Sequence, residues 1–314
     1  MFFWRVIKKR LFPILFLLFL FPGLSKAGQE IVAIQSIRVK PYEDAMRGFQ
    51  GVCSARVERI VISESGGTDV VRKITEISPD MVLAIGKDAL SLVKRIKTTP
   101  ILYLMVLNPQ SILSGEGNIA GVSMNIPPER QLRALLDALP ATKSIGLLYD
   151  PNRTSYLVGK AQDSAGKMGI NLIAKEVHNS REAPSLIMDM KGKIDVFWML
   201  PDITVITPQT VEFLLLFSLE NNIPLLAFSD KYVEAGAFMS TDIDAFDMGT
   251  QAGEMAKEIL FGRGVKDVRH VYARKVVIST NLMIARKLGV NLNIAMSLGA
   301  RSTEKIIREA RIIN

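Results

Sequence analysis

The sequence has few of the residues on which metal and redox sites depend. It contains one cysteine and two histidines in 314 residues, so an intrachain disulfide is impossible and no His or Cys pair has metal-ligand spacing. His178 and His270 each follow a strand-like run among polar residues, which predicts surface positions. Cys53 ends an amphipathic stretch and is predicted to be a half-buried structural thiol. We therefore expect no metal site.

Motifs for nucleotide binding and nucleophilic catalysis are also absent. The chain has no Gly-x-Ser-x-Gly turn and no phosphate loop ending in Gly-Lys-Ser or Gly-Lys-Thr. Gly115, Gly117 and Gly121 depart from the dinucleotide-binding spacing, and a strand-like segment rather than a helix follows them. We expect no cofactor and no catalytic residues, although a serine–histidine pair that only the fold brings together stays possible.

The one long apolar run stands at the N-terminus and is typical of a secretory signal peptide. Residues 1–27 contain a basic segment, an apolar segment over 11–24 that includes two prolines, and Ser25-Lys26-Ala27 at the expected cleavage site. The apolar segment is shorter than the ~20 residues of a spanning helix. We predict a periplasmic protein; the alternative is an uncleaved membrane anchor.

The positive charge belongs mostly to this leader. The whole chain carries +8, but five of its 39 basic residues and none of its 31 acidic ones lie in residues 1–27, so the mature chain carries +3. Nucleic acid is therefore not an expected partner.

The remaining chain alternates short apolar runs with helical periodicity, which predicts parallel α/β architecture. The order strand, polar loop, helix, proline, strand occurs in residues 80–104 and again in residues 195–228. The predicted strands are continuous apolar runs, as expected when helices cover both faces of a sheet. The sequence therefore predicts two similar lobes, each a small doubly wound parallel sheet.

In such sheets, ligands bind beyond the carboxyl ends of the strands, where helix N-termini favour anions and aspartates can hold an ammonium group. Each loop residue taken alone could equally be a helix cap or a turn former. The candidate ligand-binding residues are Gln35, Ser36, Gly86, Lys87, Asn108, Asn152, Thr154, Asp202, Thr204, Ser229 and Asp230.

Among these candidates, Asp202 is the one expected to bind a ligand ammonium group. It follows the apolar run 194–200, and Pro201 fixes the chain just before it. We expect its carboxylate to face the space between the lobes, unburied, and to hold a ligand ammonium group. The alternative is that it caps the following turn.

Several blocks of the sequence resemble the substrate-binding proteins of a bacterial ABC-transporter family with the periplasmic binding protein type I fold. They are "PDMVLAIGKDAL", "SIGLLYDPNRTS", "NNIPLLAFSDKYVEAGAFMSTDIDAFDMGTQAGEMAKEIL" and "VVISTNLMIARKLGV". Together they extend over nearly the whole mature chain.

The resemblance implies two lobes joined by three crossovers. Together with the leader and an amphipathic tail, this predicts a signal peptide over 1–27, a first lobe over 28–140 and 244–266, a second lobe over 141–243 and 267–290, and a C-terminal surface helix over 291–314. The positions at which such proteins approach their ligand correspond to Asn108, Asn152, Thr154, Asp202 and Asp230.

The resemblance also implies a function. The expected protein is a monomer that closes on a small, amino-acid-like ligand and delivers it to an ABC permease and its ATPase. Three cleft segments depart from the family's usual residues, namely Gly86-Lys87, Leu107-Asn108-Pro109 and residues 201–204, so the ligand can differ from those of other members. The alternatives are a binding module for a membrane sensor or chemoreceptor, and a secreted α/β hydrolase.

The leader gives the first testable prediction. We expect the exported form to begin at Gly28, because Ser25 and Ala27 occupy the positions that the peptidase reads. N-terminal sequencing of the protein recovered outside the cytoplasm measures this. A membrane-bound chain that still begins at Met1 would contradict it.

Overall fold

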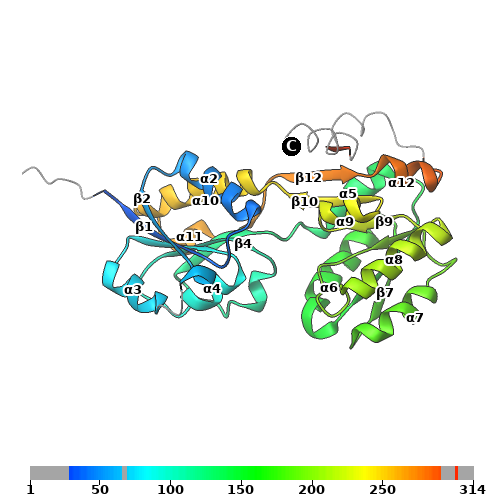
Figure 1. The fold of residues 1–314 in the computed structure, drawn as a ribbon, viewed down its shortest axis with the longest axis horizontal. Coiled ribbons are helices and arrows are strands. Elements are labelled where there is room, and N and C mark those ends of the chain that lie inside the picture. The colour runs from blue at the N-terminus through cyan, green and yellow to red at the C-terminus, as the bar shows by residue number, and fades with distance from the viewer. Residues whose placement is uncertain (1–27, 66–68, 291–300, 303–314) are drawn as a thin grey trace, which may run out of the picture.

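The computed structural model describes residues 28–65, 69–290 and 301–302, which form two α/β lobes side by side (Figure 1). The predicted signal peptide lies outside these residues, as does most of the predicted C-terminal helix. Within that predicted helix, Arg301–Ser302 instead form a short strand, β13, which pairs with β12 (Val276–Thr280).

The first lobe is built on a six-stranded sheet in which all pairs are parallel. Its order is β11-β5-β4-β3-β1-β2. The strands are β1 (Glu30–Gln35), β2 (Arg56–Val61), β3 (Met81–Ile85), β4 (Ile101–Val106), β5 (Ile119–Ser123) and β11 (His270–Tyr272). The central strands β3 and β4 are buried along their whole length, as their continuous apolar sequences predicted.

The second lobe has a seven-stranded sheet of order β13-β12-β10-β9-β8-β6-β7. Its remaining strands are β6 (Ser144–Tyr149), β7 (Asn171–Glu176), β8 (Val196–Trp198), β9 (Leu225–Ala227) and β10 (Met239–Ile243). All pairs are parallel except β10 with β12, which run antiparallel. The prediction of two similar α/β lobes is confirmed.

Helices cover both faces of each sheet (Figure 1). The first lobe holds α2 (Lys40–Val52), α3 (Val70–Ile77), α4 (Lys87–Val93), α10 (Ala245–Leu260) and α11 (Val265–Val268). The second holds α5 (Pro128–Ala138), α6 (Pro151–Lys167), α7 (Ala183–Met188), α8 (Pro208–Asn221), α9 (Asp230–Ala235) and α12 (Leu282–Lys287). No helix in the described ranges is long and apolar enough to cross a membrane.

The chain passes between the lobes three times, and two of the predicted boundaries were wrong. The first crossover follows β5 rather than residue 140, because α5 buries Leu132 and Leu135 in the core of the second lobe. The third follows β11 rather than residue 266, because β11 extends the first sheet beside β5. The second lies at Asp244, as the sequence placed it, and Asp244 caps α10 by accepting a hydrogen bond from the Asp247 N–H.

Polar contacts tie the three crossovers to one another. The Arg130 guanidinium, at the start of α5, donates to the carbonyl oxygens of Ala273 and Arg274 in the third crossover at 3.3 Å. Lys275 forms an ion pair of 2.5 Å with Asp244 in the second. The three connecting segments are thus fastened together as one hinge.

The closest helix contact joins α10 to α2 and depends on glycine. A Cβ added to Gly249 would lie 1.8 Å from the backbone oxygen of Ala45, and one added to Gly48 would lie 2.0 Å from the backbone oxygen of Phe246. No side chain fits at these distances, so the two helix backbones are in direct contact. This contact holds α10, which enters from a strand of the second lobe, firmly in the first.

Gly249→Ala is expected to lower the free energy of unfolding by about 1–3 kcal/mol or more, because the two helices must separate to admit the methyl group. Gly159→Ala is the matched control: Gly159 lies within α6 with nothing within 4 Å of the added Cβ, so alanine should stabilise by about 0.5–1 kcal/mol. Urea unfolding measures both. Equal effects in the two variants would contradict the helix contact described.

Candidate ligand-binding site

The carboxyl ends of the strands in the two lobes enclose a cleft. Its central cavity, of about 340 Å³, is lined from both lobes. The first lobe contributes Tyr42, Lys87, Met105, Leu107, Asn108, Ser111 and Met124, and the second contributes Asn152, Arg153, Thr154, Pro201, Asp202 and Ile203. This is the position at which doubly wound sheets bind ligands.

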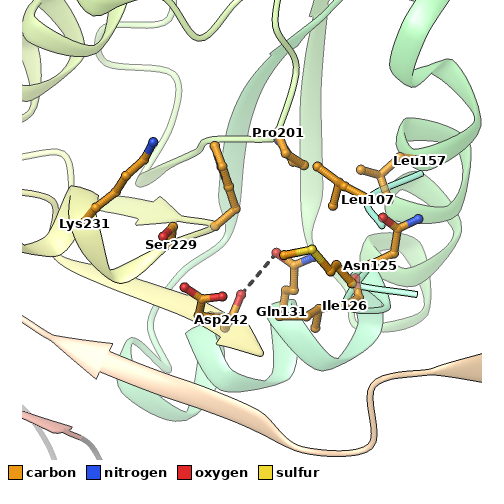
Figure 2. A pocket seen from close by; sticks show the side chains of 12 residues that line it. Leu107, Asn125, Ile126, Gln131, Leu157, Pro201, Ser229, Lys231 and Asp242 are labelled. Carbon is orange, nitrogen blue, oxygen red and sulfur yellow. Dashed lines mark hydrogen bonds between the residues drawn. The ribbon is translucent and has the colours of Figure 1, made fainter. Parts of the chain in front are cut away.

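A second cavity, of about 230 Å³, adjoins the first and shares Leu107, Met124 and Pro201 with it. Figure 2 shows its two sides, with Leu107, Asn125, Ile126 and Leu157 facing Ser229 and Asp242. Most of its walls are apolar. Its polar lining residues are Asn125 in the first crossover, Gln131 on α5, Ser229 before α9, Lys231 on α9, and Thr241 and Asp242 on β10. An elongated ligand with one apolar end fits this arrangement.

Gln131 forms part of this cavity and links three segments. Its side-chain oxygen accepts hydrogen bonds from the Trp198 indole N–H at 3.2 Å and from the Thr241 hydroxyl at 3.3 Å, the latter drawn in Figure 2. Its amide nitrogen donates to the Ile126 carbonyl oxygen at 2.8 Å. The amide thereby joins the first crossover to β8 and β10.

The second cavity is lined by one carboxylate, that of Asp242. This carboxylate accepts hydrogen bonds from the backbone N–H groups of Ile243 and Asp230, at 2.7 and 3.4 Å. Among the described residues no basic side chain forms an ion pair with it. Burial raises the pKa of Asp242 above its ordinary value, and the nearby negative charge of Asp230 raises it further. A ligand cation would relieve both effects.

A third cavity, of about 250 Å³, lies beside the first crossover and shares Asn125, Ile126 and Leu157 with the second. At its edge the Lys160 ammonium group stands 4.5 Å from the centre of the Tyr156 ring and donates to the Tyr272 hydroxyl at 3.3 Å. Lys160 belongs to α6 and Tyr272 to β11, so this contact spans the two lobes.

The structure brings most of the predicted site residues to these cavities. Those that line the three cavities are Lys87, Asn108, Asn152, Thr154, Asp202 and Ser229, and Asp230 lines a fourth cavity of about 650 Å³ beside Asp242. Those that line none of them are Gln35, Ser36, Gly86 and Thr204.

These four residues serve the folding of the loops instead. The buried Ser36 hydroxyl accepts a hydrogen bond from the Ala89 N–H of α4. The buried Gln35 bonds to Glu43 and Arg59, the pair in which the guanidinium lowers the pKa of Glu43 to about 2. Gly86 has a φ of 94°, a conformation that glycine adopts readily. The side chains of Gln35 and Ser36 are therefore already bonded within the first lobe.

Thr204 lies on the same side of the cleft as Asp202 but is bound to its neighbours. Its hydroxyl donates to the Asp150 carboxylate at 2.7 Å and accepts from the Arg153 guanidinium at 3.1 Å. The Thr204 hydroxyl lowers the pKa of Asp150 below its ordinary value. Thr204 thus helps to fix the loop that follows β6.

The expectation that Asp202 presents an unburied carboxylate was wrong. Its side chain is 1% exposed although the loop borders the cleft. One oxygen accepts from the Asp150 N–H at 2.8 Å and the Thr154 hydroxyl at 2.6 Å, and the other from the N–H groups of Thr204 and Val205. Four donors satisfy this carboxylate, so it joins the loops after β6 and β8 instead of awaiting a cation.

The histidines and the cysteine hold no reactive position. His178 and His270 are exposed, as predicted, whereas Cys53 is 3% exposed and fully rather than half buried in the core of the first lobe. Within the described ranges, no three His, Cys, Asp or Glu side chains are grouped in a way that could hold a metal ion.

Sequence reasoning missed Asp242, Gln131 and the apolar lining at Met105 and Met124. Asp242 is the penultimate residue of β10, whose sequence Met-Ser-Thr-Asp-Ile has neither a continuous apolar run nor a clear alternation. Its position at the carboxyl end of a strand was the available signal. Gln131 lies inside a helix, where periodicity says nothing about a polar side chain that turns inward.

Asp202→Asn should lower the free energy of unfolding by about 1–3 kcal/mol without any ligand present, because an amide group replaces one acceptor that two buried donors need. Asp137→Asn, at an exposed position of α5, is the control and should change little. Urea unfolding of the ligand-free protein measures this. Unchanged stability of the Asp202 variant would contradict the capping role and restore the first expectation, that the carboxylate serves the ligand.

Three comparisons with known proteins agree with this geometry. The family model described as ABC transporter substrate binding protein matches residues 63–304. A tyrosine-binding protein of Clostridioides difficile (strain R20291) is 26% identical over 208 residues, which are 63% of this chain and 60% of that relative. The chain thus spans less than two thirds of this curated relative.

Solved structures share the fold. The ligand-free, open structure of a substrate binding protein with adhesive properties from Clostridium difficile has a TM-score of 0.74 at 23% identity, covering 87% of this chain and 98% of that one. An ABC domain in complex with L-Trp from Streptococcus pneumonia has a TM-score of 0.62 at 20% identity, covering 88% and 99%. Two lobes around a lined cleft and a family match over most of the sequence lead to one conclusion: this chain belongs to the ABC transporter substrate-binding protein family.

Proposed function

We propose that this protein is exported and captures an amino acid with a large apolar side chain between its lobes, for delivery to an ABC importer. The observation that carries the proposal is the cavity in which an unpaired, half-buried carboxylate, Asp242, stands opposite an apolar wall. An ammonium group at Asp242 would form a charge-assisted hydrogen bond. The adjoining apolar walls would bury the ligand side chain.

The relatives support this ligand class. One is a tyrosine-binding protein, and another was crystallised with L-Trp. The apolar cavity walls of Leu107, Met124, Ile126, Leu157 and Phe228 suit a side chain of that size. The ligand carboxylate would find donors among the exposed residues of the central cavity, Lys87 and Arg153, which come from opposite lobes.

Closure follows from this division of contacts. A ligand that bonds to both lobes stabilises the arrangement in which they are close, because the open arrangement satisfies only one set of contacts. The three tied crossovers form the hinge for this movement. The importer would recognise this closed form of the protein.

Calorimetric titration with the twenty L-amino acids tests the proposal, using protein unfolded and refolded to remove any bound ligand. Aromatic and large aliphatic amino acids should bind most tightly, and the acidic ones weakly, because Asp230 and Asp242 repel a second carboxylate. Absence of binding by every amino acid, or tightest binding of aspartate or glutamate, would contradict it.

Asp242→Asn should weaken binding of the best amino acid by roughly 10- to 150-fold, the equivalent of a charge-assisted bond of about 1.5–3 kcal/mol. Asp163→Asn is the control, since Asp163 is exposed on α6 and lines no cleft cavity, and it should bind as the wild type does. Uptake of the labelled amino acid by cells that lack the gene should be restored by the wild type and much less by the Asp242 variant.

A further inference from the structure

Strand β4 contains a β-bulge at Met105. Tyr103 pairs with Gly121 and Val106 pairs with Ser123, so between these two pairs β4 contains one residue more than β5. Met105 has a φ of 56°, in the left-handed region, which favours glycine. A bulge of this kind ordinarily has glycine in that position. A methionine there is strained and calls for a compensating role.

The bulge changes which face of the sheet each side chain takes. Ile101 and Tyr103 pack in the core on the α3 and α4 face, and Leu102 and Leu104 pack on the α2 and α10 face. Regular alternation would send Met105 back to the first of these faces. Instead, Met105 packs on the α2 and α10 face, the same face as Leu104. The next residue, Val106, packs on the α3 and α4 face, so the alternation continues.

Because of this change of face, Met105 lies between two cavities. The central cleft cavity of about 340 Å³ and a neighbouring cavity of about 650 Å³, which extends past Asp242 toward the N-terminus of α2, have two lining residues in common. These are Met105 and Met124, and Met105 is 3% exposed. The two methionine side chains therefore stand as a partition between the cleft and the larger space.

We propose that Met105, aimed by the bulge, forms with Met124 the partition that closes the cleft toward the larger cavity, and that this partition limits the size of the ligand side chain through Met124, which also lines the apolar cavity. The proposal rests on the proposed function. Methionine suits this role because its unbranched, flexible side chain adapts to different shapes. The role in the partition explains why position 105 has a long side chain, although glycine would adopt this backbone conformation with less strain.

The first arm of the test compares stabilities. At Met105 the glycine variant should unfold at a higher urea concentration than the alanine variant, because glycine relieves the left-handed strain. Met81 is the matched control: it is a fully buried methionine of the same core on the regular strand β3, where glycine should be worse than alanine. The same order of glycine and alanine at both positions would overturn the proposal.

The second arm compares affinities for L-leucine, L-phenylalanine and L-tryptophan by calorimetry. In Met105→Ala and in Met124→Ala the preference should move toward the larger side chain by about tenfold, because the cleft then opens into the neighbouring cavity. Met124→Ala carries this arm even where Met105→Ala folds poorly, and Met81→Ala should keep the wild-type ranking.

The outcomes distinguish a failure of the proposed function from a failure of the partition alone. A wild type that binds none of the twenty L-amino acids overturns the proposed function, and the partition with it. A wild type that binds amino acids, with a ranking left within twofold by both cleft variants, overturns the partition alone.

Discussion

The direct contact between the backbones of α2 and α10 is the constraint on which the two-lobe arrangement depends. The chain reaches α10 from β10, a strand of the second sheet, and must then be held in the first lobe. Gly48 and Gly249 allow the helices to approach until each backbone touches the other. Because α10 is fixed there, the chain leaves the second lobe at Asp244, and the neighbouring carboxylate of Asp242 is brought to the cleft.

Much of the architecture could be predicted from the sequence because the buried parallel strands are continuous apolar runs. The strands over 81–85 and 101–106 illustrate this. Strand β10 escaped prediction because its Ser240 and Thr241 are polar yet fully buried. Pairing with strands on both sides satisfies its backbone, and Gln131 takes up the Thr241 hydroxyl. Helix α5 and strand β11 were placed in the wrong lobe or missed, since only tertiary packing assigns them.

The loops that border the cleft could be predicted from the sequence, but not which of their polar side chains are already satisfied. The rule that ligands lie at the carboxyl ends of strands led to the loops that border the cleft, and Asn108, Asn152 and Thr154 line its cavities. It could not tell which polar groups are already satisfied. Asp202 and Ser36 accept hydrogen bonds from nearby backbone N–H groups, whereas no basic side chain among the described residues forms an ion pair with Asp242. Such satisfaction depends on distances that no sequence pattern contains.

The ties among the three crossovers bear on how the lobes can move. A single flexible linker would let one lobe rotate in any direction, whereas three segments joined by Arg130 and by the Lys275–Asp244 pair restrict the directions in which the lobes can rotate. The proposed closing movement would then follow a similar path whatever occupies the cleft. The rims of the two lobes would reach a similar separation each time, and a receptor would recognise that geometry without contacting the ligand.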